Sequence, residues 1–380
     1  MKIKMVDLGR QLEPIKNEVE TAINAVLDAT NFIQGQQVRT FEQSLAKWVG
    51  AGHAISCGNG TDALQLALMA LGLKKGDEVI VPSFTYVATA EVIALLGLKP
   101  LLVDVHEDSF NIDVEAASNL ITEKTKAIVP VHLYGQCADM EAIMSIAQKH
   151  NLYVVEDTAQ AIGAEVTFSD GSKKKAGTIG HIGTTSFFPS KNLGCFGDGG
   201  AIFTNDDKLA TELKMIANHG QRVKYHHDVV GVNSRLDTIQ AAILNVKLDY
   251  LHSYCKARQK AATFYDEALS SIQGLSVPIR SEFSSHVFHQ YTIKIASPYS
   301  RDDLKDYLAH NGVPSMIYYP LPLHEQKAYS SFIDKHLKFS KSTKLCNQVL
   351  SLPMHTELKS EELSFITELI KDYFNSKNVG

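Results

Sequence analysis

The sequence predicts an α/β protein, with a large domain on a mostly parallel, mixed sheet and a smaller α+β domain at the C-terminal end. From about residue 50 to residue 205, short apolar strand patterns alternate with helical stretches, as βαβ units require. The 380 residues are 44% hydrophobic and 21% charged, a typical globular composition. From Ser276 onward strand and helix patterns mix. We therefore predict a large domain over residues 1–250, which includes an N-terminal helical segment, and a small domain over residues 251–380.

The first part of the sheet is predicted from apolar strand patterns that end at turn-forming or polar residues. The strands expected in chain order are His53–Ser56, Glu78–Pro82, Pro100–Val105, Ala127–Val131 and Tyr153–Glu156. Helical patterns lie between them, with apolar residues on one face; they are Asp62–Leu71, Ala88–Leu96 and Met140–Lys149. In such sheets ligands bind beyond the carboxyl ends of the strands, so functional residues are expected directly after strands.

The pattern changes after residue 180. The strand patterns Ser186–Phe188 and Gly200–Thr204 enclose a glycine-rich segment, which predicts a hairpin and a sheet that is not purely parallel. The remaining patterns are helices from Asp206 to Ala217 and from Arg235 through Ile272, a strand at Gln290–Ile295, and helices at Arg301–His310 and Glu361–Tyr373. Ser360 is the expected N-cap of the last helix.

Charge and composition exclude several classes of protein. The chain has 37 basic and 42 acidic side chains, a net charge of −5, which lacks the basic signature of a general nucleic-acid binder. Its longest uncharged run, from Tyr307 to His324, contains three prolines and predicts no membrane span. The charged N-terminus predicts no signal peptide, and the five cysteines, with no C-x-x-C pair, indicate reduced thiols. We expect a cytoplasmic protein.

A carboxylate and an amine both lie where strands are expected to end. Asp157 follows the strand Tyr153–Glu156, and Lys191 follows Ser186–Phe188 and precedes the glycine-rich segment. A pyridoxal phosphate enzyme needs such a pair: a lysine that bonds to the cofactor and a carboxylate that pairs with its protonated ring nitrogen. A buried ion pair, or two unrelated surface charges, is the alternative that spacing alone leaves open.

The segment Gly58–Ala63 also matches G-x-G-x-x-A between a strand and a helix, the dinucleotide-binding pattern. That pattern expects an acidic residue at the end of the second strand, but Pro82 and Ser83 end this one. The same turn serves a single phosphate equally well, through amides at a helix N-terminus. A nicotinamide oxidoreductase remains the alternative from a different class.

Histidine pairs raise the question of a metal. His226–His227 and His286-x-x-His289 lie in no H-E-x-x-H motif, and no cysteine pair completes a zinc set, so we predict no metal. The basic segment from Gln221 to His227 suits a diphosphate or a carboxylate, or is a solvated loop. Arg235 is the better carboxylate ligand, because its planar fork binds with two bonds.

Five segments together resemble the DegT/DnrJ/EryC1/StrS family of nucleotide-sugar aminotransferases, which have the fold-type I, aspartate aminotransferase-like fold of pyridoxal phosphate enzymes. They are NGTDAL (Asn59–Leu64), PSFTYVATAE (Pro82–Glu91), EDTAQAIGA (Glu156–Ala164), SFFPSKNLGCFGDGGA (Ser186–Ala201) and GVNSRLDTIQAAIL (Gly231–Leu244). HLYGQCADM, NHGQRVKYHH, YYPLPLHEQ and SLPMH most resemble the enzymes that aminate UDP-2-acetamido-2-deoxy-3-oxo-glucuronic acid.

The resemblance implies a role for each matching residue. Lys191 would carry the cofactor and move protons, Asp157 would hold the ring nitrogen, and Gln160 would bond near the ring oxygen. Tyr86 would stack on the ring, and the phosphate would be held by Gly60, Thr61 and Ser186. Asn233 would reach the phosphate of the neighbouring subunit's cofactor, which makes a homodimer part of the site. By the resemblance, Tyr318, Tyr319 and His324 would line the sugar pocket, with a packed loop as the alternative. His227 and Arg235 are candidates for binding the sugar nucleotide because both side chains are basic.

The implied activity is amino transfer from L-glutamate to a UDP-linked 3-oxo-glucuronate for O-antigen or other surface polysaccharide. Family members that dehydrate carry histidine at the lysine position, and this chain has Lys191. A dTDP-3-keto or a 4-keto-6-deoxy hexose is the alternative substrate, and a cofactor-binding regulator the alternative function.

Overall fold

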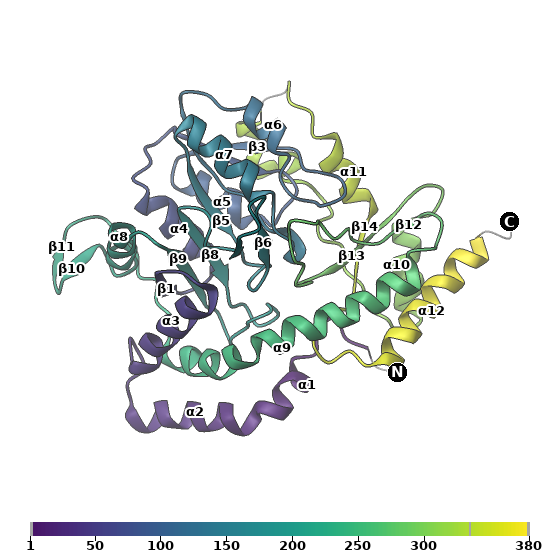
Figure 1. The fold of residues 1–380 in the computed structure, drawn as a ribbon, viewed down its shortest axis with the longest axis horizontal. Helices are drawn as coiled ribbons and strands as arrows, with labels where there is room; N and C mark the ends of the chain where they lie inside the picture. The colour runs from purple at the N-terminus through teal and green to yellow at the C-terminus, as the bar shows by residue number, and fades with distance from the viewer. Residues whose placement is uncertain (1–2, 334–335, 378–380) are drawn as a thin grey trace.

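A seven-stranded sheet forms the centre of the computed structural model, which describes residues 3–333 and 336–377 (Figure 1). Its strands, in spatial order, are β1 (His53–Cys57), β9 (Gly200–Thr204), β8 (Ile182–Ser186), β5 (Tyr153–Asp157), β4 (Thr125–Ile128), β2 (Glu78–Pro82) and β3 (Lys99–Val103). β9 runs antiparallel to both of its neighbours, and the other neighbouring pairs are parallel. The predicted mostly parallel, mixed sheet is confirmed.

Helices cover both faces of this sheet, because alternate strand residues point to opposite sides. Ile80 belongs to one apolar core, and its neighbours Val79 and Val81 belong to the other. The first core is closed by α3 (Gln36–Val49), α7 (Met140–His150) and the first half of α9 (Thr238–Leu269). The second is closed by α4 (Gly60–Ala70), α5 (Ala88–Leu95) and α8 (Asp207–Ala217).

The long helix α9 connects the two halves of the molecule (Figure 1). Its second half contributes Ala262, Tyr265 and Leu269 to a separate apolar core. That core is completed by the sheet β12 (Leu275–Ser276), β13 (Tyr291–Ile295) and β14 (Val349–Leu352), and by α10 (Arg301–His310) and α12 (Ser360–Lys377). The predicted division at residue 250 falls inside α9, because the helical pattern continues across it.

The other helices lie at the periphery. α1 (Leu8–Leu12) and α2 (Lys16–Ala29) precede the sheet, and α2 lies along α9 (Figure 1). α6 (Val114–Asn119) follows β3, and α11 (Ser340–Gln348) leads into β14. Hairpin β6 (Glu165–Thr167) and β7 (Lys173–Lys175) lies outside the main sheet.

Several element boundaries differ from the sequence expectations. β8 ends at Ser186 instead of beginning there, and the chain then turns at Phe188 to Lys191, where Pro189 has no amide hydrogen to continue a ladder. α9 begins three residues after Arg235, because that stretch is extended and Asn233 bridges to Asn218. α12 starts at Ser360 itself.

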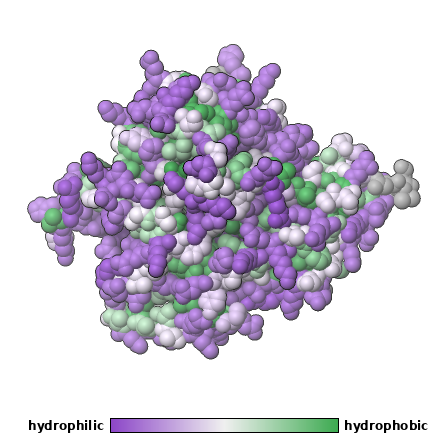
Figure 2. Space-filling model, viewed as in Figure 1, coloured by the Kyte–Doolittle hydropathy of each residue, from purple (hydrophilic) through white to green (hydrophobic). Residues whose placement is uncertain are grey.

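A second hairpin, β10 (Gln221–Val223) and β11 (His226–His227), projects from the body of the molecule (Figure 1). Its apolar residues are exposed: Tyr225 is 79% accessible, and Val230 just beyond it is 89% accessible. The face drawn in Figure 2 is otherwise mostly hydrophilic, with small scattered apolar areas. No helix in the described residues has the length and apolar character needed to cross a membrane. All five cysteines are buried free thiols.

Candidate active site

A cavity of about 650 Å³ lies at the carboxyl ends of β2, β5 and β8, next to the N-terminus of α4. This is where a parallel sheet is expected to bind its ligand. The predicted site residues that line it are Gly60, Thr61, Tyr86, Asp157, Gln160, Ser186, Lys191, Tyr318 and Tyr319. The cavity therefore combines residues from both halves of the chain.

Lys191 lies in the tight turn after β8, where its amide donates to the carbonyl of Phe188 at 2.8 Å. Burial lowers the pKa of the Lys191 amine to about 8, and the nearby Asp157 charge partly opposes this shift. The structure records no hydrogen bond or ion pair from Nζ to any residue that it describes. A partnerless amine with a lowered pKa is a competent nucleophile and base.

Asp157 is the last residue of β5, is only 6% exposed, and has its carboxylate oriented by two donors. Thr89 Oγ1 donates to Oδ2 at 2.8 Å, and the amide of Ala159 donates to Oδ1 at 3.1 Å. Both oxygens retain a lone pair, so the carboxylate can accept a further donor from the cavity.

Gly60 and Ser186 form the end of the cavity at the first turn of α4. A Cβ atom on Gly60 would lie 2.6 Å from Cβ of Ser186, so only glycine allows this approach. Asn59 caps the helix by accepting from the amide of Asp62 at 2.8 Å. The amides at the start of a helix lack intrahelical acceptors, and together with the hydroxyls of Thr61 and Ser186 they suit a phosphate.

Aromatic side chains also line the cavity. Tyr86 is 57% exposed, and its ring centroid lies 6.2 Å from that of Tyr319. Gln160 links the halves of the molecule, because its Oε1 accepts from the amide of Tyr134 at 2.7 Å and its Nε2 donates to Tyr319 Oη at 3.2 Å. Burial raises the pKa of Tyr319, which keeps its hydroxyl protonated.

Sequence reasoning missed His289 as part of this cavity. It is 6% exposed, and its Nδ1 is buried without a hydrogen-bond partner. Burial, and then the charges of Lys191 and Arg258, lower its pKa well below the usual value, so the ring is neutral. His286 stacks on Phe288 at 3.8 Å and does not line the cavity, so the H-x-x-H spacing is not a shared site. Within the described ranges no cluster of three histidine, cysteine or acidic residues could hold a metal.

Four predicted site residues do not line this cavity in the single chain. Asn233 is exposed, and His227 lies on the projecting hairpin, with Nδ1 2.8 Å from the carbonyl of His219. Arg235 lines a second cavity of about 500 Å³. His324 bridges Ser83 and Thr343, at 2.6 Å and 3.3 Å, and stacks on Phe339.

The turn Gly58–Ala63 lacks the partner that a dinucleotide needs. β2 ends at Pro82, followed by Ser83, and neither is acidic. Glu78 lies at the opposite end of β2, where it is bonded to Thr122 and Lys99. The turn therefore suits a single phosphate, and the end of β2 has no carboxylate for a ribose.

Curated relatives match almost the whole chain. A "UDP-2-acetamido-2-deoxy-3-oxo-D-glucuronate aminotransferase" of Pseudomonas aeruginosa is 46% identical over 96% of this chain and 98% of its own length. A "UDP-N-acetyl-3-dehydro-alpha-D-glucosamine 3-aminotranferase" of Acidithiobacillus ferrooxidans is 44% identical over 97% of each. A "Pleiotropic regulatory protein" of Geobacillus stearothermophilus is 45% identical over 98% of this chain and 99% of its own length.

Solved structures agree with the fold. DesV of S. venezuelae, in complex with a ketimine intermediate, superposes with a TM-score of 0.93 and 37% identity over 98% of both chains. NtdA of Bacillus subtilis, with the bound cofactor PMP, gives 0.90 and 31% identity over 98% of this chain and 85% of its own. The expectation of an aspartate aminotransferase-like, pyridoxal phosphate-dependent fold is confirmed.

The family model for DegT/DnrJ/EryC1/StrS aminotransferases matches residues 13–371, nearly the whole described chain. With the fold and the near full-length relatives, this match shows that the chain belongs to the DegT/DnrJ/EryC1/StrS aminotransferase family.

Proposed function

We propose that this protein transfers the amino group of L-glutamate to UDP-2-acetamido-2-deoxy-3-oxo-D-glucuronate, using pyridoxal phosphate, for a surface polysaccharide such as O-antigen. The observation that carries the activity is that one cavity holds both Lys191 and the oriented carboxylate of Asp157. The Lys191 amine has a pKa of about 8 and no hydrogen-bond partner among the described residues. The substrate follows from the Pseudomonas aeruginosa relative, whose name gives that sugar nucleotide.

The cavity fits this cofactor at three points. Asp157 retains acceptor capacity for the ring nitrogen, and Tyr86 offers an exposed ring to stack on. The first turn of α4 with Ser186 suits the phosphate. When bound, pyridoxal phosphate supplies an electron sink that makes the α-hydrogen of an amino acid acidic.

The side chains that line the cavity would supply the base, the charge near the ring nitrogen and the walls around the ligand. Lys191 would hold the cofactor through Nζ, and its amine would serve as the base for the proton on the α-carbon of the donor. The charge of Asp157 would favour the protonated form of the ring nitrogen. Tyr319, from the C-terminal half, accepts from Gln160 Nε2 at 3.2 Å, and both side chains line that side of the cavity.

A second copy of the chain completes the site in this proposal. Asn233 and Arg235 lie outside the Lys191 cavity of their own chain. Exposed Tyr225 lies on the hairpin that precedes them, and exposed Val230 lies in the segment that follows this hairpin. Docking that surface onto a second copy would bury these apolar side chains and would bring Asn233 to the partner's phosphate site. Arg235, with Arg39, Lys214 and Arg222 around the same cavity, suits an anionic sugar nucleotide.

The experiment that tests the function is an absorption spectrum followed by a substrate panel. We expect a visible cofactor band that L-glutamate converts, and turnover with the UDP-3-oxo-glucuronate. UDP-3-dehydro-N-acetylglucosamine and a dTDP-3-keto hexose are the controls. Preference for either control would overturn the substrate, and a protein that binds no pyridoxal phosphate would overturn the function. A regulator without transferase activity would bind the cofactor and turn over none of the panel.

The pH dependence of cofactor attachment follows from Lys191. Only the neutral amine attacks the cofactor aldehyde, and the pKa of this amine is about 8. The attachment rate of the cofactor-free protein should rise about tenfold per pH unit up to pH ~8 and level off above it. Stopped-flow absorbance measures this, with free N-acetyl-lysine as the control. A rate that still rises steeply above pH 9 would contradict the lowered pKa.

A further inference from the structure

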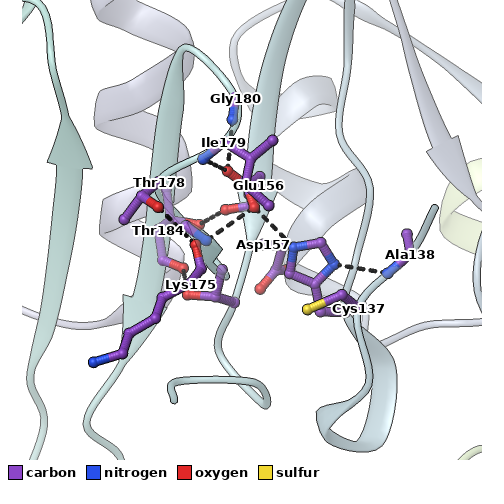
Figure 3. Close-up of polar contacts among 12 residues, drawn as sticks. Cys137, Ala138, Glu156, Asp157, Lys175, Thr178, Ile179, Gly180 and Thr184 are labelled. Atoms are coloured by element: carbon purple, nitrogen blue, oxygen red, sulfur yellow. Dashed lines mark hydrogen bonds and ion pairs between the residues drawn. The ribbon is translucent and has the colours of Figure 1, made fainter. Parts of the chain in front are cut away.

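Glu156, the residue before Asp157 on β5, has a carboxylate that is completely buried. Its Oε1 accepts from the amides of Ile179 and Gly180, both at 2.7 Å. Its Oε2 accepts from the amide of Gly177 at 2.9 Å and lies 3.0 Å from Nε2 of His132. Figure 3 shows Glu156 with Ile179 and Gly180 beside it. The two oxygens thus accept from three backbone N–H groups, and an ionised carboxylate, which has only acceptors, suits such a set of donors.

The hydrogen bond at Nδ1 of His132 determines which ring nitrogen carries the hydrogen. The amide of Ala138 donates to Nδ1 at 3.1 Å, so Nδ1 carries no hydrogen and Nε2 must donate to Glu156. His132 is therefore neutral in this arrangement. Beside it, burial and then the Glu156 charge raise the pKa of the Cys137 thiol to about 12, so this thiol also stays uncharged. Among the described residues, the recorded donors to the Glu156 carboxylate are three backbone amides and the neutral His132 ring.

Hydrogen bonds to the backbone connect the segments around Glu156 to Asp157, from the loop after β4 on one side and from β8 on the other. The backbone amide of His132 donates to the carbonyl of Asp157 at 3.0 Å, and the amide of Asp157 donates to Pro130 at 2.9 Å. On the other side the hydroxyl of Thr184, in β8, donates to the carbonyl of Glu156 at 3.0 Å. Glu156 thus ties the loop after β4 and the loop before β8 to the end of β5.

Adjacent strand residues point to opposite faces of a sheet, so the side chains of Glu156 and Asp157 face different surroundings. Asp157 turns toward the cavity, and Glu156 turns toward the loop of residues 177–180. A small shift of the chain at Glu156 would move the Asp157 carboxylate relative to a ligand in the cavity. Displacements of about 1 Å at such a group can cost about 10²-fold in rate.

We propose that Glu156, together with His132, is a positioning residue that fixes Asp157 against the ring nitrogen of the cofactor. This inference rests on the proposed function, because it needs Asp157 in that role. A packing role predicts that replacing Glu156 lowers only the stability of the protein. A positioning role predicts in addition that the absorption spectrum of the bound cofactor changes and that its affinity falls.

The test compares Glu156→Gln with Glu78→Gln. Glu78 is also a buried carboxylate, 5% exposed and bonded to Thr122, Thr125 and Lys99, but it lies at the opposite end of the sheet. We expect Glu156→Gln to weaken pyridoxal phosphate binding by about tenfold or more and to shift the pH midpoint of the bound cofactor's absorption. Glu78→Gln should change neither, whatever it does to the melting temperature. Equal cofactor affinity and equal spectra in the two variants would overturn the proposal.

Two variants of His132 test the same proposal independently, in case the Glu156→Gln variant does not fold. His132→Phe retains a ring and loses both ring hydrogen bonds, whereas the amide of His132→Gln can still donate to Glu156. We expect His132→Phe to shift the spectrum and His132→Gln to lie nearer the wild type. The reverse order, or no difference between them, would count against the proposal.

A third comparison shows whether the effect passes through Asp157. In an Asp157→Asn background, Glu156→Gln should add little further loss of cofactor affinity, because residues that act as a unit are not additive. Fully additive losses would overturn the positioning role. Failure of the proposed function is recognised separately, since the wild type would then bind no cofactor or Asp157→Asn would leave its binding and spectrum unchanged.

Discussion

Replacing Lys191 with alanine is expected to abolish transamination, with a fall in kcat of about 10⁴-fold or more. The variant loses both the nucleophile that bonds to the cofactor and the base that takes the α-proton, and base catalysis alone contributes about 10²–10⁴-fold. Its amine also has no hydrogen-bond partner among the described residues, so the fold should tolerate its removal. Steady-state kinetics with L-glutamate measure the loss, and borohydride reduction followed by mass spectrometry shows whether the cofactor is still attached.

Lys191→Arg is the matched control, because it keeps a positive charge in the cavity without a nucleophilic amine. It should be as inactive as the alanine variant, which assigns the loss to chemistry instead of charge. Thermal unfolding of the cofactor-free proteins verifies that all three chains are folded. An active Lys191→Ala enzyme would end the assignment of this lysine.

Replacing Asp157 with asparagine is expected to lower kcat by roughly 10²–10³-fold while the cofactor stays attached to Lys191. The amide keeps the shape of the side chain and an acceptor for Thr89, whose hydroxyl donates to Oδ2 at 2.8 Å. It removes the charge that holds the ring nitrogen protonated, and preorganised charge of this kind contributes about that factor. Kinetics and the absorption spectrum of the variant are the measurements.

Asp198 supplies the control for this second experiment. It also lines the cavity, but it is exposed and lies in the glycine-rich loop after Lys191. Asp198→Asn should leave the cofactor spectrum unchanged, since an exposed charge is screened by solvent. If both variants lost activity equally, overall cavity charge, and not the Asp157 contact, would explain the result.

The strand-end chemistry could be predicted because it depends on local order along the chain. Asp157 and Ser186 both end parallel strands, and the carboxyl ends of parallel strands meet at one edge. Gly60 opens the helix that follows β1, which is also parallel to β8. Periodicity and turn residues in the sequence are therefore enough to predict that these positions lie at the same edge of the sheet.

The C-terminal side of the cavity could not be predicted in this way. Tyr319 reaches Gln160, 159 positions earlier in the chain, through a bond that depends on how α9 carries the C-terminal half back over the sheet. His289 appeared in the sequence only as half of a histidine pair, and the chain turn before β13 separates it from His286. Thr89 gave no signal, because it lies in an apolar helix.

By itself, then, the sequence determined the α/β class, the succession of strands and helices along the chain, and the positions of Asp157 and Lys191 after predicted strands, since each follows from local patterns. Only the tertiary structure decided that Tyr318, Tyr319 and His289 share the cavity that Asp157 and Lys191 line, and that Arg235 and His324 lie outside it. It also decided that the Glu156 carboxylate accepts from the amides of the loop of residues 177–180. The physical reason is that hydrogen bonds between distant segments depend on the docking of whole elements, which no local spacing encodes.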